Sequence, residues 1–186
     1  MSARPPVIEM NPDWEVVMLP FQIGSGRTVY AGLEAGPGGD ARLRLRIFRV
    51  RSTGEAVGRA WFGPGADGPP RHAHGGAVAY VLDEAMGACG WMNAYPVVAG
   101  KLEFHYLQPT PLETDLHITS RIAAKTAKRI EVTAELRLPD GRICVFGKGE
   151  FAILSRAQIK SFNQEKSASD GILKEMKLNW APDDAD

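Results

Sequence analysis

The stretch His72-Ala-His-Gly-Gly-Ala-Val-Ala-Tyr-Val-Leu-Asp-Glu-Ala-Met-Gly87 decides how this chain is organised. Its apolar residues recur at helical spacing, which predicts one long α-helix over residues 75–92 with a buried face. That face comprises Val78, Leu82, Ala85, Met86 and Cys89. Alanine and glycine occupy much of the remaining helix surface, so we expect other backbone to approach the helix closely.

The segments on either side of this helix alternate between apolar and polar residues, as half-buried strands do. The alternation predicts strands at 42–50 and 56–62, and at 97–108, 115–123, 130–138 and 142–154. Short connections favour antiparallel neighbours. We therefore predict an α+β architecture in which a curved antiparallel β-sheet wraps around one long central α-helix. Gly147 and Gly149 indicate a bulge or a close backbone approach in the last strand.

The expected helix and strands form one domain over residues 41–154, with a segment of different character on each side. Residues 1–40 are interpreted as an N-terminal arm and loop, with a short strand or packed arm at 14–21 and a glycine-rich loop at 24–40. Residues 155–186 are interpreted as a C-terminal helical tail, with short helices at 156–166 and 172–180.

Composition excludes several classes of function. The 186 residues carry 22 Lys and Arg and 22 Asp and Glu, so a zero net charge argues against a nucleic-acid partner. No apolar run approaches the roughly 20 residues that span a bilayer, and residues 1–6 lack the apolar segment of a secretory signal. We expect no membrane partner and a cytoplasmic location. Cys89 and Cys144 lie in apolar segments and are predicted to be reduced core residues.

Three motifs of this sequence occur together in one enzyme family. The most specific is His74-Gly-Gly, followed nine positions after the histidine by the acidic Asp83. The others are Leu102-Glu-Phe-His-Tyr-Leu-Gln-Pro109 and the Gly-x-Gly at 147–149. Residues 43–154 thereby resemble hotdog-fold acyl-CoA thioesterases of the PaaI-like branch. The resemblance implies the hotdog fold, thioester hydrolysis and a homodimer, leaving open whether dimers pair further. It implies no cofactor beyond the coenzyme A of the substrate.

The N-terminus of the helix is suited to stabilise a developing negative charge. Its first N–H groups lack intrahelical partners and lie at the positive end of the helix dipole. Gly75 and Gly76 have no Cβ, so a thioester carbonyl can approach the backbone, and the Gly75 N–H would stabilise the oxyanion. The alternative is that the two glycines only ease a tight entry into the helix.

Asp83 is the candidate catalytic carboxylate, either as a nucleophile or as a general base that activates water. Eight residues separate Gly75 from Asp83, which places them about 12 Å apart along the helix axis. One small carbonyl cannot readily contact both. We therefore predict two sites per dimer, each combining Gly75 of one subunit with Asp83 of the other.

Three further polar side chains lie close to Gly75 and Asp83 in the sequence. Glu84 is rotated about 100° from Asp83 and is predicted to make a surface or interface contact. His74 either orients the loop or contributes to the carbonyl site, and His72 is a candidate substrate contact. The two histidines do not predict a metal site, because no carboxylate stands four or five residues further on.

Other residues are candidates for holding the substrate. Lys128 and Arg129, at a predicted hairpin, are candidates for the coenzyme A phosphates. Ala99 and Gly100 begin the strand after the helix, where related thioesterases often carry Ser or Thr. An apolar slot between two helices would take the acyl group. Its predicted lining is Tyr80, Met86, Trp91 and Met92.

The sequence is also compatible with two other functions. A non-catalytic acyl-CoA binder or sensor is the first, because the hydroxyl side chain near Ala99 is missing. A hotdog hydratase or dehydratase is the second. Those enzymes usually pair a histidine with a carboxylate in a different local pattern.

Overall fold

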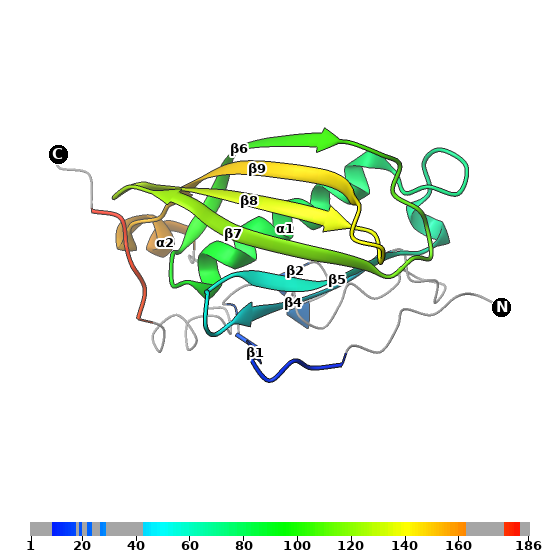
Figure 1. The fold of residues 1–186 in the computed structure, drawn as a ribbon. Coiled ribbons are helices and arrows are strands. Elements are labelled where there is room, and N and C mark those ends of the chain that lie inside the picture. The colour runs from blue at the N-terminus through cyan, green and yellow to red at the C-terminus, as the bar shows by residue number, and fades with distance from the viewer. Residues whose placement is uncertain are drawn as a thin grey trace.

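The computed structural model describes residues 9–17, 19, 22–23, 27–28, 43–162 and 177–182. Within these residues, seven strands form one antiparallel sheet in the order β1-β4-β5-β7-β8-β9-β6 (Figure 1). The strands are β1 (Trp14–Glu15), β4 (Leu43–Val50), β5 (Ala56–Phe62), β6 (Val97–Tyr106), β7 (Leu116–Lys125), β8 (Arg129–Arg137) and β9 (Ile143–Ile153). A separate two-stranded pair joins β2 (Gln22–Ile23) to β3 (Arg27–Thr28).

Helix α1 (Gly75–Met92) lies across one face of the curved sheet, with β6 at one edge (Figure 1). All five residues predicted for its buried face are buried. They pack against inward side chains of the sheet such as Ile118, Ile130 and Leu136. The observed arrangement is therefore the predicted α+β architecture, a curved antiparallel sheet around one long helix. Cys89 and Cys144 are buried free thiols, as predicted.

The arm before β4 agrees in part with the predicted short strand or packed arm at 14–21. Among its described residues, Trp14–Glu15 form a strand that pairs with β4, and Val17 and Leu19 pack on the core. The expected loop at 24–40 lies outside the described residues except for Arg27–Thr28, which forms β3. The loop prediction is wrong at these two residues, because pairing between strands overrides the flanking glycines.

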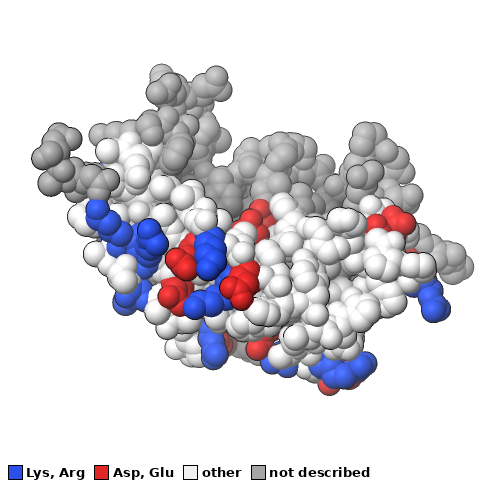
Figure 2. Space-filling model, turned by 90° about the horizontal axis from the view of Figure 1, so that it is seen from above, with Lys and Arg blue, Asp and Glu red and all other residues white. Residues whose placement is uncertain are grey.

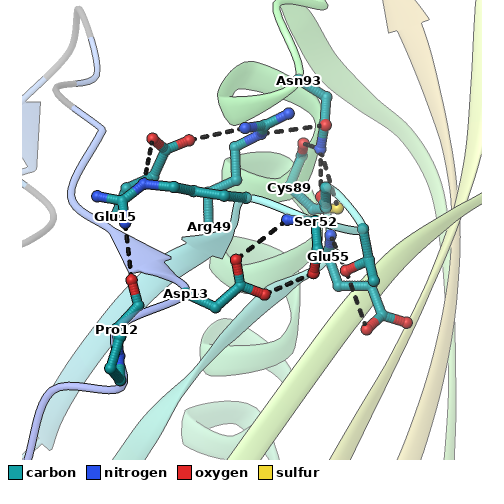
Figure 3. A network of polar contacts seen from close by, with 11 residues as sticks. Pro12, Asp13, Glu15, Arg49, Ser52, Glu55, Cys89 and Asn93 are labelled. Atoms are coloured by element: carbon teal, nitrogen blue, oxygen red, sulfur yellow. Dashed lines mark hydrogen bonds and ion pairs between the residues drawn. The ribbon is translucent and has the colours of Figure 1, made fainter.

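A polar network ties this arm to the C-terminal end of α1 (Figure 3). Asn93 donates from Nδ2 to the carbonyl oxygens of Gly54 and Cys89, at 2.7 and 2.8 Å. Arg49 donates to Asn93 Oδ1 at 3.4 Å and to Glu15 at 2.7 Å, and this bond lowers the pKa of Glu15. The network satisfies carbonyl groups that the helix end leaves without partners.

The C-terminal segment is only partly helical. Helix α2 (Arg156–Phe162) starts with reciprocal bonds between Ser155 and Gln158, at 2.8 and 3.3 Å, which form a capping box. The helix predicted at 172–180 is wrong for its described part, because residues 177–182 are not helical. Their backbone instead bonds to the core, from Asn179 N–H to Ala94 O at 2.7 Å and from Ala181 N–H to Leu154 O. Neither described α-helix is long and apolar enough to cross a membrane.

A β-bulge in the edge strand β6 sets which side chains face α1. The register with β9 shifts between Ala99 and Lys101, so Gly100 is an extra residue. An extra residue reverses the alternation of side chains. Val97 before the bulge and Phe104 after it therefore both pack on the core. Without the bulge, Lys101 and Glu103 would face the helix.

Glycines let the strands approach α1, as the abundance of small residues predicted. A Cβ on Gly90 would lie 2.7 Å from the Val97 side chain. A Cβ on Gly147 would lie 3.3 Å from both Leu82 and Phe104. Of the two alternatives predicted for Gly147 and Gly149, close approach is confirmed. The alternative prediction of a bulge at these two glycines is wrong, because the register shifts in the pairing of β9 do not fall at either of them.

Replacement of Gly58 by alanine tests the close pairing of β4 and β5. The added Cβ would overlap the carbonyl oxygen of Arg46, a backbone atom that cannot rotate away. We expect Gly58→Ala to lower the free energy of unfolding by about 2–3 kcal/mol, in the range of overpacked cores. Urea unfolding measures this. Val57→Ala, at the half-buried neighbour, should cost about 1 kcal/mol or less. Equal stability of the two variants would contradict this close pairing of β4 and β5.

Candidate functional site

One face of α1 is left open by the described strands. Its half-buried or exposed residues recur at helical spacing and define what we call the open face: Gly76, Ala79, Tyr80, Asp83, Glu84 and Gly87. Two carboxyl groups on an otherwise apolar helix are thus placed where a ligand or another chain can reach them. The surface seen from the β6 side is largely uncharged, with most of its charged side chains gathered toward one end (Figure 2).

The N-terminus of α1 is capped by His74. Its Nδ1 accepts the N–H of Gly76 at 3.0 Å, and its carbonyl oxygen accepts the N–H groups of Ala77 and Val78. Because Nδ1 is an acceptor, a neutral ring carries its proton on Nε2. This geometry agrees with the first of the two roles predicted for His74, orientation of the loop.

Gly75 and Gly76 therefore differ. The Gly76 N–H is already bonded to His74. The Gly75 N–H has no acceptor among the residues that the structure describes. Gly75, the predicted donor, keeps an open N–H at the positive end of the helix dipole.

Asp83 lies at the middle of the open face. Burial raises the pKa of its carboxyl above the usual range. A carboxylate that loses water becomes a stronger base, and perturbed carboxyls cluster at functional sites. Its half-buried position is therefore compatible with catalysis.

Glu84 was predicted to make a surface or interface contact, but its carboxyl is partly removed from water. Burial first, and then the charge of Asp83, raise its pKa to about 7. Tyr80 lies one helical turn earlier, and burial with the charges of Glu84 and Asp83 raises its pKa to about 12. The Tyr80 hydroxyl is buried, and its interaction with the Glu84 carboxyl partly offsets the rise in the pKa of Glu84. The open face thus carries three titratable groups whose charges affect one another, Tyr80, Asp83 and Glu84.

One chain does not bring Gly75 and Asp83 together. Both lie on the same uninterrupted helix of 18 residues. Eight residues of helix correspond to about 12 Å of rise. The structure therefore keeps the separation that the spacing predicted.

The remaining predicted contacts are spread around α1. His72 lies in the preceding loop, with Nδ1 2.9 Å from the carbonyl oxygen of Pro70. Ala99 and Gly100 are exposed at the bulge. Ala99 pairs with Phe151, whose ring is 3.8 Å from where a Cβ on Gly87 would lie. Ala99 is therefore level with the turn after Asp83.

Lys128 and Arg129 are exposed at the hairpin that joins β7 to β8, as predicted. Arg129 lies 3.6 Å from Glu150, and 70% of its side chain is exposed. A hollow near this end of α1 is lined by Gly54, Asn93, Tyr95, Lys125 and neighbours, but by neither of these two residues.

The acyl slot was predicted wrongly at three of its four residues. Met86, Trp91 and Met92 are 0%, 6% and 6% exposed and belong to the core. Trp91 donates from Nε1 to Val97 O at 3.0 Å, which holds its ring inward. Tyr80 alone is partly exposed, because the closely approaching strands cover the other three.

Tyr106 was missed as a site residue. Its hydroxyl donates to Gly75 O at 2.8 Å, so the end of β6 contacts the start of α1. The alternation that places Leu102 and Phe104 on one face of β6 places Tyr106 on the same face, where it remains 52% exposed at the end of the strand. This signal could have found it.

Removal of the Glu84 charge should make stability less dependent on pH. Between the ordinary pKa of 4.5 and the folded value of about 7, the unfolded chain ionises while the folded one stays protonated. Wild-type stability therefore falls as pH rises through this window. We expect Glu84→Gln to match wild type near pH 4. It should gain about 1–3 kcal/mol over wild type by pH 8, after allowance for partial solvation. Urea unfolding across this range measures it, and a constant difference would contradict the burial of Glu84.

Comparison with known proteins finds a family model and solved structures that match part of this chain. The model of the thioesterase superfamily matches residues 71–145. A solved structure described as a thioesterase superfamily protein is 27% identical with a TM-score of 0.56. That match covers 59% of this chain and 53% of the other, so the chain spans about half the length of this relative.

Two more distant structures show the same fold. The PaaI protein of the Escherichia coli phenylacetic acid degradation operon is 14% identical, with a TM-score of 0.55 over 61% of this chain and 80% of that one. A hypothetical thioesterase of Streptococcus pneumoniae, solved with coenzyme A, is 15% identical, with a TM-score of 0.54 over 60% and 87%. The segment 71–145, which contains Gly75 and Asp83, therefore matches the model of the thioesterase superfamily, and the chain has the hotdog fold that its resemblance to PaaI-like thioesterases implied.

Proposed function

We propose that this protein hydrolyses an acyl-CoA thioester to the free acid and coenzyme A. The observation that carries the proposal is the open Gly75 N–H at the N-terminus of the helix that also presents Asp83. Both lie within the segment that matches the thioesterase superfamily. The helix thus supplies an electrophilic and a basic group of the kinds that acyl transfer requires.

Gly75 acts on the thioester carbonyl. The carbonyl oxygen accepts the Gly75 N–H, and the bond strengthens as negative charge develops on that oxygen. The helix dipole adds to this stabilisation. Loss of one such donor typically costs about 100- to 1,000-fold in rate.

Asp83 acts on the nucleophile. As a general base it takes a proton from water while the water oxygen adds to the carbonyl carbon. The C–S bond then breaks, and the proton passes to the leaving thiolate. Burial raises the pKa of Asp83 and so strengthens it as a base. As a nucleophile it would instead form an anhydride that water hydrolyses, and this alternative remains within the proposal.

Each site combines residues of two subunits. The separation of about 12 Å between Gly75 and Asp83 excludes action of both from one helix on one carbonyl. Small residues on the open face, Gly76, Ala79 and Gly87, allow a second helix to approach. Two antiparallel copies of α1 across a two-fold axis would place Gly75 of one beside Asp83 of the other. The homodimer is the smallest active unit in this proposal, and dimers can pair further.

Coenzyme A is held by residues around this centre. Lys128 and Arg129 are exposed cations suited to its phosphates. Related folds have been solved with coenzyme A and with acetyl CoA, from Streptococcus pneumoniae and Streptococcus mutans. Tyr80 lines the acyl slot, and Ala99 and Gly100 border it. The free thiols of Cys89 and Cys144 fit a reducing cytoplasm.

A second candidate function is acyl-CoA binding without hydrolysis. Ala99 offers a methyl group where related enzymes often carry a hydroxyl that holds water. A binder would keep the coenzyme A contacts and lack release of thiol. No observation favours a hydratase or dehydratase.

Thiol release from a panel of acyl-CoAs separates enzyme from binder. We expect Asp83→Asn to lower the rate by about 100- to 10,000-fold, the usual contribution of a general base. Asp140→Asn, in the exposed turn before β9, is the matched control and should keep wild-type release. Tight binding of acyl-CoA by wild type without release, measured by calorimetry, would overturn the proposal in favour of the binder.

Subunit sharing is tested with a heterodimer purified through two different tags. One chain carries Gly75→Trp, which fills the approach to the donor, and the other carries Asp83→Asn. One of the two shared sites is then intact, so activity should recover to about half of wild type per dimer.

Each homodimeric parent should be inactive. An inactive heterodimer of confirmed composition and native circular dichroism would contradict sharing, because sites within single chains would remain broken.

A further inference from the structure

We propose that Tyr106 is a positioning residue that holds the first turn of α1 so that the Gly75 N–H is aimed at the substrate carbonyl. The inference rests on the proposed function and assigns a role within its site. Tyr106 touches the peptide that follows the donor and is not itself proposed to contact the reacting atoms.

The two polar groups of one peptide are both held. In the peptide that joins Gly75 to Gly76, the carbonyl oxygen accepts the Tyr106 hydroxyl at 2.8 Å. The N–H of the same peptide donates to His74 Nδ1 at 3.0 Å. The plane of this peptide is thereby held from two sides, while the preceding N–H, that of Gly75, stays open.

The Tyr106 ring also packs on the same residue. A Cβ on Gly75 would lie 3.7 Å from the ring atoms Cε1 and Cζ and from the hydroxyl oxygen. This is ordinary van der Waals contact, so the ring lies directly beside the glycine backbone. A tyrosine has an ordinary pKa of about 10, so the phenol is protonated and able to donate at neutral pH. Partial burial raises the pKa of Tyr106 further.

The glycine pair explains why such a contact is needed. Glycine loses more conformational freedom on folding than any other residue, and helix ends fray. Two consecutive glycines in the first turn would leave the donor loosely placed. A displacement of about 1 Å can cost about 100-fold in rate, so a hydroxyl that holds this peptide acts on catalysis.

The position of Tyr106 depends on the bulge at Gly100. The extra residue puts Leu102, Phe104 and Tyr106 on the side of β6 that faces α1. Tyr106 ends the strand, where the chain passes the start of the helix. The bulge and the tyrosine therefore form one device, in which the edge strand sets the geometry of the helix N-terminus.

The test is Tyr106→Phe, which removes the hydroxyl and keeps the ring. We expect kcat to fall about three- to tenfold, the size of one neutral hydrogen bond, while KM changes less than about twofold. Tyr95→Phe is the matched control, because it removes a hydroxyl bonded to Lys125 at 3.1 Å near the opposite end of α1. The control should keep wild-type kcat. An equal kcat for wild type and Tyr106→Phe would overturn the inference.

A second readout does not depend on activity. In ¹⁵N-labelled protein, Tyr106→Phe should shift the amide resonances of Gly75 and Gly76, whereas Tyr95→Phe should leave both in place. Unmoved Gly75 and Gly76 resonances would overturn the inference even if kcat fell. Failure of wild type to release thiol from any acyl-CoA overturns the proposed function instead, and the amide resonances then still decide whether Tyr106 holds the peptide.

Discussion

Burial of α1 inside the curved sheet is the constraint on which the rest of this structure depends. The helix is apolar on most sides, and residues such as Val81, Leu82 and Met86 are fully removed from water. Transfer of such side chains from water stabilises the fold by about 1.5–3 kcal/mol each, an upper estimate. The sheet can surround the helix only if it curves. One helical face then remains without strands, and that face carries Asp83 and Glu84.

Close approach between backbone segments connects this packing to the site. Gly90 and Gly147 let β6 and β9 come near α1, because larger side chains there would meet Val97 and Leu82. The same proximity brings Tyr106, at the end of β6, to the carbonyl of Gly75. Catalytic geometry in the proposed mechanism is thus a consequence of how tightly the edge strand follows the helix. The charged pairs of the outer sheet face, such as Lys148 with Glu131, lie apart from this and contribute little to it.

Sequence periodicity predicted most of the fold because burial repeats with the period of each element. The limits of α1 and β5 agree with the prediction, and the other central strands differ by one or two residues. Two predictions failed for the same reason. Residues 177–180 were predicted to be helical, but Asn179 bonds to Ala94. Met86, Trp91 and Met92 were predicted to line a slot, but β6 covers the end of the helix that carries Trp91. Packing between elements overrides local preference in both cases.

The sequence by itself determined the α+β class, the buried face of the helix, and the distance along the helix between a glycine donor and a carboxylate. Each follows from the rise and period of a regular element, which depend only on local backbone geometry. Only the tertiary structure decided that Glu84 is as much a part of the buried cluster as Asp83, and that Tyr106 contacts the helix start. The Tyr106 bond joins residues 31 positions apart, and desolvation depends on all surrounding elements. No local pattern contains that information.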